Sequence, residues 1–147
     1  MAIQFLIFLS AFASLPLQVN GIGEQAYGVK GCLLCGTKPA VGIKVRLVDH
    51  DTADPDDVMA NGSTGSDGCF NISGYESEMT AIDPELYIWH DCDDGMPGSR
   101  EVRIELPGSY ITPGIVAKNI FPLGTLNLET KFKEEGRSIF NRKRSSN

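Results

Sequence analysis

The sequence predicts an all-β protein, an antiparallel sandwich or barrel, on three observations. Apolar and polar residues alternate with a period of two in most segments after residue 22, as in strands with one buried face. Turn-forming Gly, Pro, Asn and Asp residues separate these segments at short intervals. No segment shows the apolar period of an amphipathic helix. The patterned part has the length of one domain with a single core.

The strands follow from this pattern. Residues 43–47 and 102–106 alternate strictly between apolar and charged side chains, which predicts two half-buried strands. Residues 86–90 are apolar on both faces and predict a central strand. Weaker patterns predict three further strands, at residues 27–34, 69–72 and 123–128.

The segments between these strands carry turn chemistry. The pair Asn61 and Gly62 predicts a turn. Met59 and Ala60 fit a short strand before that turn. Residues 76–80 predict a loop or a single helical turn.

The first residues predict export. They are almost entirely apolar, uncharged and too few to span a bilayer, which is typical of a secretory signal peptide cleaved after Ala13 or Gly21. No later stretch is long and apolar enough to cross a membrane, and the last residues carry no lipid-anchor signal. We therefore expect a signal peptide at 1–21, one domain at 22–130, and release to the extracellular space.

The formal net charge of −6 is unevenly distributed. Residues 22–130 hold 7 basic and 17 acidic residues, whereas residues 131–147 hold 6 basic and 2 acidic residues. An acidic body argues against nucleic acid as a partner. The basic segment predicts a flexible tail that aids solubility, an arm for an anionic surface, or a site of proteolytic trimming. The candidates for anionic-surface binding are Lys131, Lys133, Arg137, Arg142, Lys143 and Arg144.

Four cysteines, Cys32, Cys35, Cys69 and Cys92, follow the predicted signal peptide and allow three pairings. A redox-active Cys-x-x-Cys motif would need a helix directly after it, and a turn that starts at Gly36 stands there instead. A zinc site would need a second ligand pair at close spacing, which this sequence lacks. Export to an oxidising compartment therefore favours two structural disulfides, while the spacing leaves their pairing open.

Two loops are rich in aspartate, at residues 49–57 and 91–94. If they meet at one end of the fold, they form a weak calcium site; otherwise they form a solvated acidic rim. The motif of a calcium-binding EF-hand is missing, so we predict no metal site and no cofactor. Two sequons predict N-glycosylation of an exported chain at Asn61 and Asn71.

Several motifs in a fixed order carry a resemblance to a known family. They are Val29-Lys-Gly-Cys-Leu-Leu-Cys35, Thr64-Gly-Ser-Asp-Gly68, Ile88-Trp-His-Asp-Cys92, Ser109-Tyr-Ile-Thr112 and Leu123-Gly-Thr-Leu-Asn-Leu-Glu129. With them the chain resembles the nematode transthyretin-like family over nearly all of the predicted domain. The resemblance implies a transthyretin-like (prealbumin-like) sandwich of two antiparallel sheets and a secreted role.

The resemblance also implies a disulfide pairing. Many members carry a further cysteine where this chain has residues 96–98, and this chain has Cys32 and Cys69 instead. On a transthyretin-like layout the first strand pairs with the strand that contains Cys69. The family layout therefore implies the bridges Cys32–Cys69 and Cys35–Cys92.

Catalysis is not expected. The related hydroxyisourate hydrolases use histidines, an arginine and a C-terminal Tyr-Arg-Gly-Ser motif on this fold, and this chain lacks them at matching positions. Of its two histidines, His50 is expected in an exposed acidic turn and His90 as a buried structural residue.

The sequence thus predicts a secreted, non-enzymatic binding protein, an extracellular adaptor or signalling ligand that docks a cell surface. The expected partner is a protein receptor or an anionic lipid, and an association of the family with exposed phosphatidylserine fits the basic tail. The alternative is a carrier of a small hydrophobic ligand, which in transthyretin occupies a channel between subunits. A purely structural extracellular component is a third class, and the oligomeric state stays open.

Overall fold

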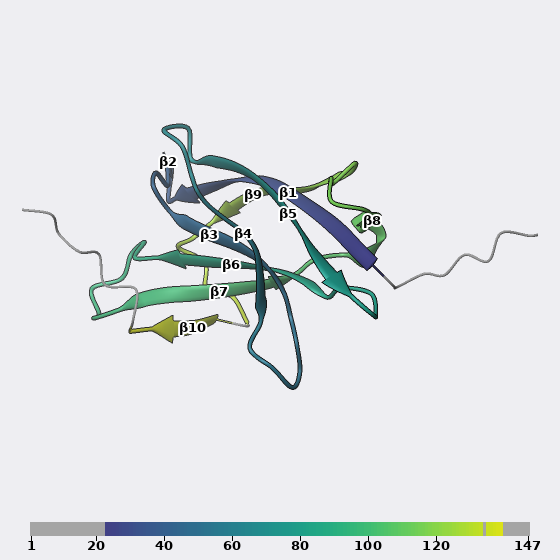
Figure 1. Cartoon of the computed structure of the whole chain (residues 1–147). Coiled ribbons are helices and arrows are strands. Elements are labelled where there is room, and N and C mark those ends of the chain that lie inside the picture. The colour runs from purple at the N-terminus through teal and green to yellow at the C-terminus, as the bar shows by residue number, and fades with distance from the viewer. Residues whose placement is uncertain (1–22, 134, 140–147) are drawn as a thin grey trace, which may run out of the picture.

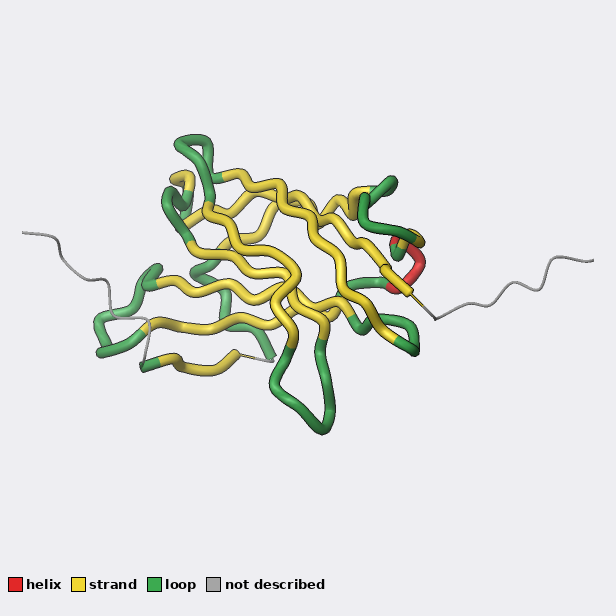
Figure 2. The backbone as a smooth tube through the Cα atoms, viewed as in Figure 1, coloured by secondary structure: helices red, strands yellow, loops and turns green. Residues whose placement is uncertain are grey.

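A computed structural model describes residues 23–133 and 135–139 and has the predicted fold class, a sandwich of two β-sheets (Figures 1 and 2). Apart from one short 3-10 turn, η1 (Gly108–Tyr110), its regular elements are strands. The predicted signal peptide and the basic residues Arg142, Lys143 and Arg144 lie outside the described residues. No helix among the described residues is long and apolar enough to cross a bilayer.

The two sheets hold five strands each. Sheet A consists of β1 (Gly23–Cys35), β2 (Lys38–Pro39), β5 (Cys69–Glu78), β8 (Thr112–Pro113) and β9 (Ile120–Asn127). Sheet B consists of β3 (Lys44–Asp49), β4 (Asp57–Ser63), β6 (Pro84–His90), β7 (Ser99–Glu105) and β10 (Glu135–Ser138).

Strand β1 organises sheet A. It pairs antiparallel with β5 along one side and parallel with β9 along the other. Its register with β5 places Cys32 directly opposite Cys69. Pro122 and the left-handed Gly124 (φ 83°) interrupt β9, and both weaken an outer strand as a template for another chain.

Strand β6 lies in the middle of sheet B, in the order β10-β7-β6-β3-β4, as its apolar sequence predicts. Leu86 and Ile88 of β6 are fully buried and face Tyr27, Val29 and Leu33 of β1 in one core cluster. Full burial of each such aliphatic side chain stabilises the fold by about 1.5–3 kcal/mol. The alternation of apolar and polar residues in both sheets therefore places the apolar side chains in one shared core.

The two sheets come closest along the edge formed by β4 and β5. A Cβ atom on Gly74 of β5 would lie 2.1 Å from the carbonyl oxygen of Met59 on β4. A Cβ atom on Gly62 would lie 2.5 Å from Ile72. Both glycines are therefore required by close approach of the sheets rather than by left-handed backbone.

This contact corrects the prediction of a turn at Asn61 and Gly62, since both residues lie inside β4. The turn that joins β4 to β5 comes later, at residues 64–68, where Gly68 adopts a φ of 77°. Residues 76–78, predicted as a loop or helical turn, continue β5.

The structure also differs from the prediction of a flexible tail that starts at Lys131. Residues 135–138 form β10, which pairs antiparallel with β7. Buried Arg100 of β7 explains this pairing, because its guanidinium binds both carboxylate oxygens of Glu135, at 2.6 and 2.8 Å. The same guanidinium donates to the carbonyls of Cys92, Leu128 and Thr130, so all five of its N–H groups have a partner.

Candidate functional site

The four cysteines form two disulfides, Cys32–Cys69 and Cys35–Cys92, the same pairs that the resemblance implies. The first joins two neighbouring strands on the outer face of sheet A. The second joins the end of β1 to the residues after β6 and therefore links the two sheets. No free cysteine is present among the described residues, which leaves them no thiol for redox or metal chemistry.

The two aspartate-rich loops lie at opposite ends of sheet B. Strands β3 and β6 are antiparallel, with Asp49 opposite Pro84 and Lys44 opposite Trp89. The loop after β3 therefore lies beside the start of β6, while the loop after β6 lies beside the start of β3. The two loops cannot share a calcium ion, because the sheet separates them.

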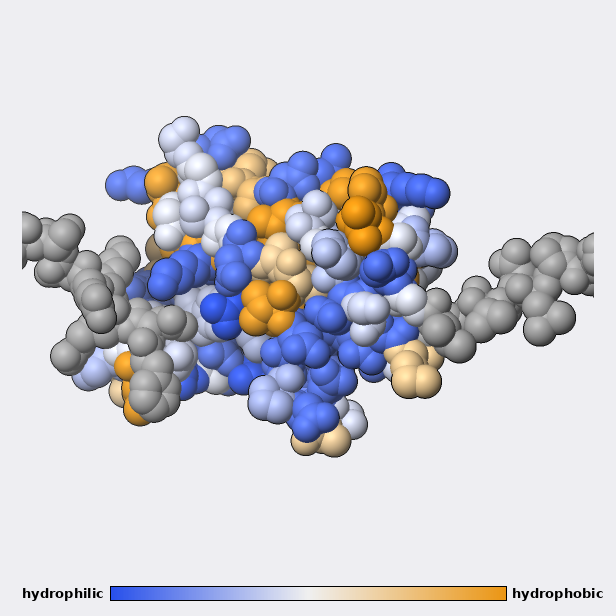
Figure 3. All heavy atoms as spheres, viewed as in Figure 1, coloured by the Kyte–Doolittle hydropathy of each residue, from blue (hydrophilic) through white to orange (hydrophobic). Residues whose placement is uncertain are grey.

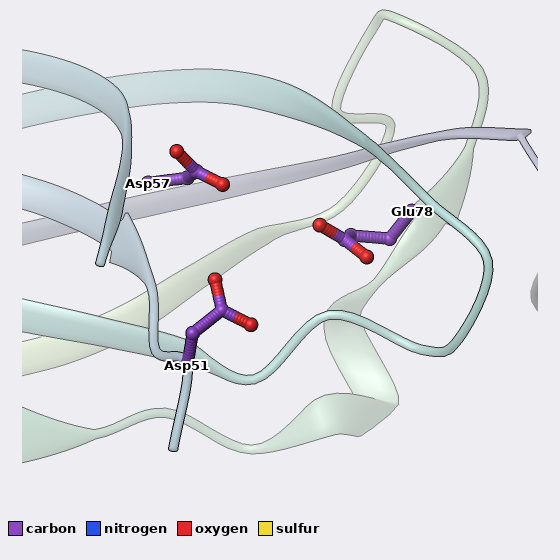
Figure 4. Close-up of side chains that lie close together, drawn as sticks. All are labelled: Asp51, Asp57 and Glu78. Carbon is purple, nitrogen blue, oxygen red and sulfur yellow. The ribbon is translucent and has the colours of Figure 1, made fainter. Parts of the chain in front are cut away.

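A different set of carboxylates converges. Asp51, Asp57 and Glu78 point toward one another from the β3–β4 loop, the start of β4 and the end of β5 (Figure 4). One oxygen of each lies within 4.8 Å of the others. Like charges at this distance repel each other, so the cluster weakens this end of the fold in the absence of a counterion. Hydrophilic residues also dominate the surface of the β3–β4 loop (Figure 3).

Asp49 lies beside this cluster and is almost fully buried, at 3% exposure. Burial raises the pKa of Asp49 to about 6, and the neighbouring charges of Asp51 and Glu78 add to the rise. The amide of Asp83 donates a hydrogen bond to its Oδ1 at 2.6 Å, which opposes the rise in pKa. Its titration therefore lies within the pH range of ordinary experiments.

His50 lies in the predicted acidic loop but is held in place there. Its Nδ1 lies 2.8 Å from Oδ1 of Asp56, and the Tyr87 hydroxyl donates to the other oxygen of Asp56. The hydrogen bond with Asp56 raises the pKa of His50. Burial alone would raise the pKa of Asp56, but the hydrogen bonds from Tyr87 and His50 outweigh it and hold this pKa below its usual value.

His90 is buried as predicted, at 2% exposure. Its Nδ1 accepts the amide hydrogen of Cys92 at 3.2 Å, so the neutral ring carries its proton on Nε2. That nitrogen is buried and has no hydrogen-bond partner among the described residues. Burial, and then the charge of Arg100, lower the pKa of His90. Its surroundings favour a neutral structural residue.

The outer face of sheet B carries an ordered set of large side chains, which we call the stacked array: Arg46, Tyr87, Trp89 and Arg103. Strand register places Arg46 beside Tyr87, and Tyr87 beside Arg103. The guanidinium of Arg46 lies over the Trp89 ring, 5.2 Å from its centroid, and that of Arg103 lies 4.8 Å from the centroid of Tyr87. The two rings meet edge to face, 5.9 Å apart.

Polar partners fix the orientation of the stacked array. Glu101 accepts from Trp89 Nε1 at 2.7 Å and from Arg103 at 2.8 Å. Asn61 accepts from Arg46 Nε at 2.8 Å. Side chains fixed in this way lose little conformational entropy when a partner covers them. Trp and Arg are also among the residues that most often dominate the energy of protein interfaces. Tyr87 is itself only 6% exposed, so Arg46, Trp89 and Arg103 are the members that a partner would contact.

The outer face of sheet A carries smaller side chains than the outer face of sheet B. An open groove of about 330 Å³ crosses β5, β1 and β9 there, lined by Lys30, Gly31, Cys32, Cys69, Phe70, Asn71, Pro122, Gly124 and Thr125. Apolar atoms also gather over the loop between β8 and β9 (Figure 3), where Ile115 and Val116 are 58% and 67% exposed.

The remaining sequence-predicted residues lie apart from the stacked array or at its margin. Asn61 reaches that array from β4, whereas Asn71 lies in the sheet A groove. Arg137 forms an ion pair with Asp94 at 2.8 Å and donates to the carbonyl of Pro97, so this tail residue is part of the fold. Lys131 and Lys133 are exposed.

A carrier of a hydrophobic ligand would need an apolar cavity. Four hollows of the described residues open to the surface, the sheet A groove among them. The largest of the four, about 600 Å³, is lined mainly by polar side chains that include His50, Glu85, Arg103 and Lys133. Two smaller ones, of about 300 and 260 Å³, adjoin His50 and His90. Of the hollows described, the sheet A groove has the most apolar lining.

Sequence reasoning missed the stacked array. Its signal was present in the alternation: Arg46, Tyr87 with Trp89, and Arg103 occupy the non-core positions of strands that were correctly predicted. The register that makes them neighbours depends on pairing between distant segments, which alternation alone leaves undetermined.

Comparisons with known proteins agree with one another. Residues 30–107 match the family described as TTR-52, transthyretin-like family. Transthyretin-like protein 46 of Caenorhabditis elegans is 47% identical over 119 residues, which cover 79% of this chain and 66% of that protein. Transthyretin-like protein 5 of the same organism is 49% identical, covering 77% of this chain and 83% of its own length. Transthyretin-like protein 33 is 42% identical, covering 90% and 94%.

Proposed function

The chain belongs to the transthyretin-like family, and from that premise we propose that it is an extracellular, non-enzymatic binding protein that docks a protein receptor through the stacked array. The observation that carries the proposal is the stacking of Arg46 on Trp89 and of Arg103 on Tyr87. The two disulfides support the extracellular assignment, since such bonds persist in oxidising compartments.

The sheet B face suits a protein better than a small molecule or a sugar. A sugar that stacks on an aromatic ring needs the ring face free, and guanidinium groups already cover Trp89 and Tyr87. The guanidiniums keep outward N–H groups that bind carboxylates and carbonyls of a partner. Rim carboxylates such as Glu85 and Glu105 add negative charge at one end, so the face offers both signs to a partner.

A second candidate partner is an anionic lipid surface, which the basic segment at residues 131–147 would contact. Arg137 is committed to Asp94, so lipid contact would depend on Lys131, Lys133 and the residues beyond Ile139. Each basic residue near an acidic membrane contributes about 1 kcal/mol. We place this contact second, because the described residues offer it no continuous basic face.

The receptor proposal is tested by measuring how much labelled protein binds to intact cells. The cells come from a genetically characterised related organism or from cultures that carry the receptor. The double variant Arg46→Glu/Arg103→Glu reverses two charges on the docking face, and we expect cell binding to fall by at least about tenfold. The matched control is Lys30→Glu/Lys118→Glu, which makes the same charge change on other exposed positions. Equal loss in both variants, or no loss in the first, would remove the stacked array from the function.

A second experiment separates lipid from receptor. A truncation after Ile139 removes Arg142, Lys143 and Arg144 without touching β10, because that strand ends at Ser138. If binding to vesicles that contain phosphatidylserine disappears with this truncation while cell binding survives, the tail and the stacked array act independently. If the truncation abolishes both, the lipid contact is the function and the receptor proposal is wrong.

A further inference from the structure

We propose that Asn71 carries an N-linked glycan whose first sugars pack into the groove on the outer face of sheet A and shield the Cys32–Cys69 disulfide. The inference rests on the export part of the proposed function and not on the stacked array. It gives the sheet A face a covalently attached occupant, and leaves the sheet B face for a partner.

The attachment point is already inside the groove. Asn71 is exposed on β5, opposite Lys30 of β1, and its side chain is part of the lining. The next row on the same face of the sheet is the Cys32–Cys69 pair, which lines the same groove. A sugar linked to Asn71 therefore begins beside the disulfide and needs no long reach to cover it.

The chemistry of the groove suits an N-acetylhexosamine. The disulfide, Pro122 and the glycine backbone of Gly31 and Gly124 offer a mainly apolar floor. The sugar ring has an apolar C–H face and an acetyl methyl group that pack on such a floor. Lys30 and Thr125 line the groove as well, and they bring an ammonium and a hydroxyl that hydrogen-bond sugar hydroxyls. A volume of about 330 Å³ is within the range of small-ligand sites.

The sequon Asn71-Ile-Ser73 supplies the modification signal. In the transfer, Nδ2 of Asn71 loses one proton and forms a bond to C1 of the first N-acetylglucosamine. The C1–O bond to a lipid-linked diphosphate donor breaks, and the diphosphate leaves with the bonding electrons. Ser73 faces outward on the same strand and is exposed, so neither residue of the sequon contributes to the core.

Asn61 provides the internal comparison. It belongs to the other sequon, is exposed on β4, and its Oδ1 accepts a hydrogen bond from Arg46. None of the four hollows described above is lined by Asn61. A glycan there would project from the stacked array without a groove to receive it.

The test uses the full mature chain, exported from eukaryotic cells behind a heterologous leader. Glycopeptide mass spectrometry measures occupancy at each sequon, and trimming leaves a single N-acetylglucosamine. The rate at which a small phosphine reduces each disulfide is then compared in wild type, Asn71→Gln, Ser73→Ala and Asn61→Gln. We expect Cys32–Cys69 to be reduced at least about threefold faster in Asn71→Gln and Ser73→Ala, because access governs exchange at a disulfide, and no change in Asn61→Gln.

The Cys35–Cys92 bond is the control within each molecule, since it lies outside the sheet A groove and its reduction rate should be the same in all four proteins. An unoccupied Asn71, or occupied protein reduced as fast as Asn71→Gln, overturns the inference. The heterologous leader keeps this outcome separate from a failure of the natural export signal. Variants of Arg46 and Arg103 leave the result unchanged, so failure of the receptor proposal is also distinguishable.

Discussion

The outer faces of the two sheets are stabilised in different ways. On sheet A, small side chains surround a covalent bond between neighbouring strands, Cys32–Cys69. On sheet B, large side chains cover the strands and hold one another through stacking and ion pairs. One face of the sandwich is therefore held by a covalent bond, and the other by contacts between ordered side chains. Only the second presents the large side chains that the receptor proposal requires.

The largest expected effect is on the arginine that joins β10 to sheet B. Arg100→Met removes five hydrogen bonds and leaves Glu135 unpaired in a half-buried site, so we expect a loss of about 3–5 kcal/mol. Urea unfolding measures it. The matched change Arg137→Met affects a more exposed arginine at the same edge and should cost much less. Equal costs would show that β10 does not depend on Arg100.

The next effect probes sheet A. Replacing both cysteines of the Cys32–Cys69 bridge by alanine releases a loop with a sequence separation of 37 residues. The chain-entropy account gives a loss of about 3–4 kcal/mol. Calorimetry under non-oxidising and oxidising conditions measures it, with the outer-face variant Trp89→Ala for comparison. A smaller loss in the cysteine variant than in Trp89→Ala would reverse the contrast between the two faces.

A third prediction concerns pH at the acidic end where the two sheets meet. Because the pKa of Asp49 is raised to about 6, its folded form favours the proton, and its contribution to stability is lost as the pH rises from about 4 to about 6. Asp49→Asn keeps the acceptor for the Asp83 amide and removes the charge. At pH 7.5 we expect this variant to be more stable than wild type by about 2 kcal/mol.

The advantage of Asp49→Asn should shrink to near zero below about pH 3, where wild-type Asp49 is protonated in both the folded and the unfolded chain. Thermal unfolding at four or five pH values follows this change. An advantage that is independent of pH would mean that packing or hydrogen bonding of the amide, and not the charge of Asp49, sets the difference.

The smallest effect tests the order of the sheet B face directly. A double-mutant cycle on Arg46→Ala and Trp89→Ala should give a coupling of about 0.5–1 kcal/mol from their stacking. Lys30 and Asn71 are opposite each other in register on sheet A and form the control pair. Their cycle on unglycosylated protein should give a coupling near zero. Similar couplings in both cycles would contradict the claim that only sheet B carries an ordered face.

Much of the fold was predictable because strand alternation is local. The segments at 43–47, 86–90 and 102–106 overlap β3, β6 and β7, and their ends differ from the observed ones by at most three residues. The family and its two-sheet architecture are likewise confirmed. These features depend on the identity of residues that follow one another in the chain.

The errors share one physical cause. Gly62 was interpreted as a turn residue, but it serves a contact with Ile72 of the other sheet. Residues 135–138 were interpreted as part of a charged tail, but Glu135 and Arg137 find partners in Arg100 and Asp94. In each case a residue from a distant segment decides the local structure. A pattern of neighbouring residues along the chain carries no information about that distant residue.

The Cys35–Cys92 bond has a mechanical consequence. Figure 1 shows the start of β1 and the end of β10 at opposite ends of the sandwich, so tension applied through them runs along its long axis. The bond carries that tension directly from Cys35 to Cys92, so the chain between them, a sequence separation of 57, bears no load. A chain pulled from Gly23 and Ile139 could then extend to only about half of its unbridged contour. Reduction of this bond would lengthen the tether and bring β5 and β6 under load, while Cys32–Cys69 would still bypass β2, β3 and β4.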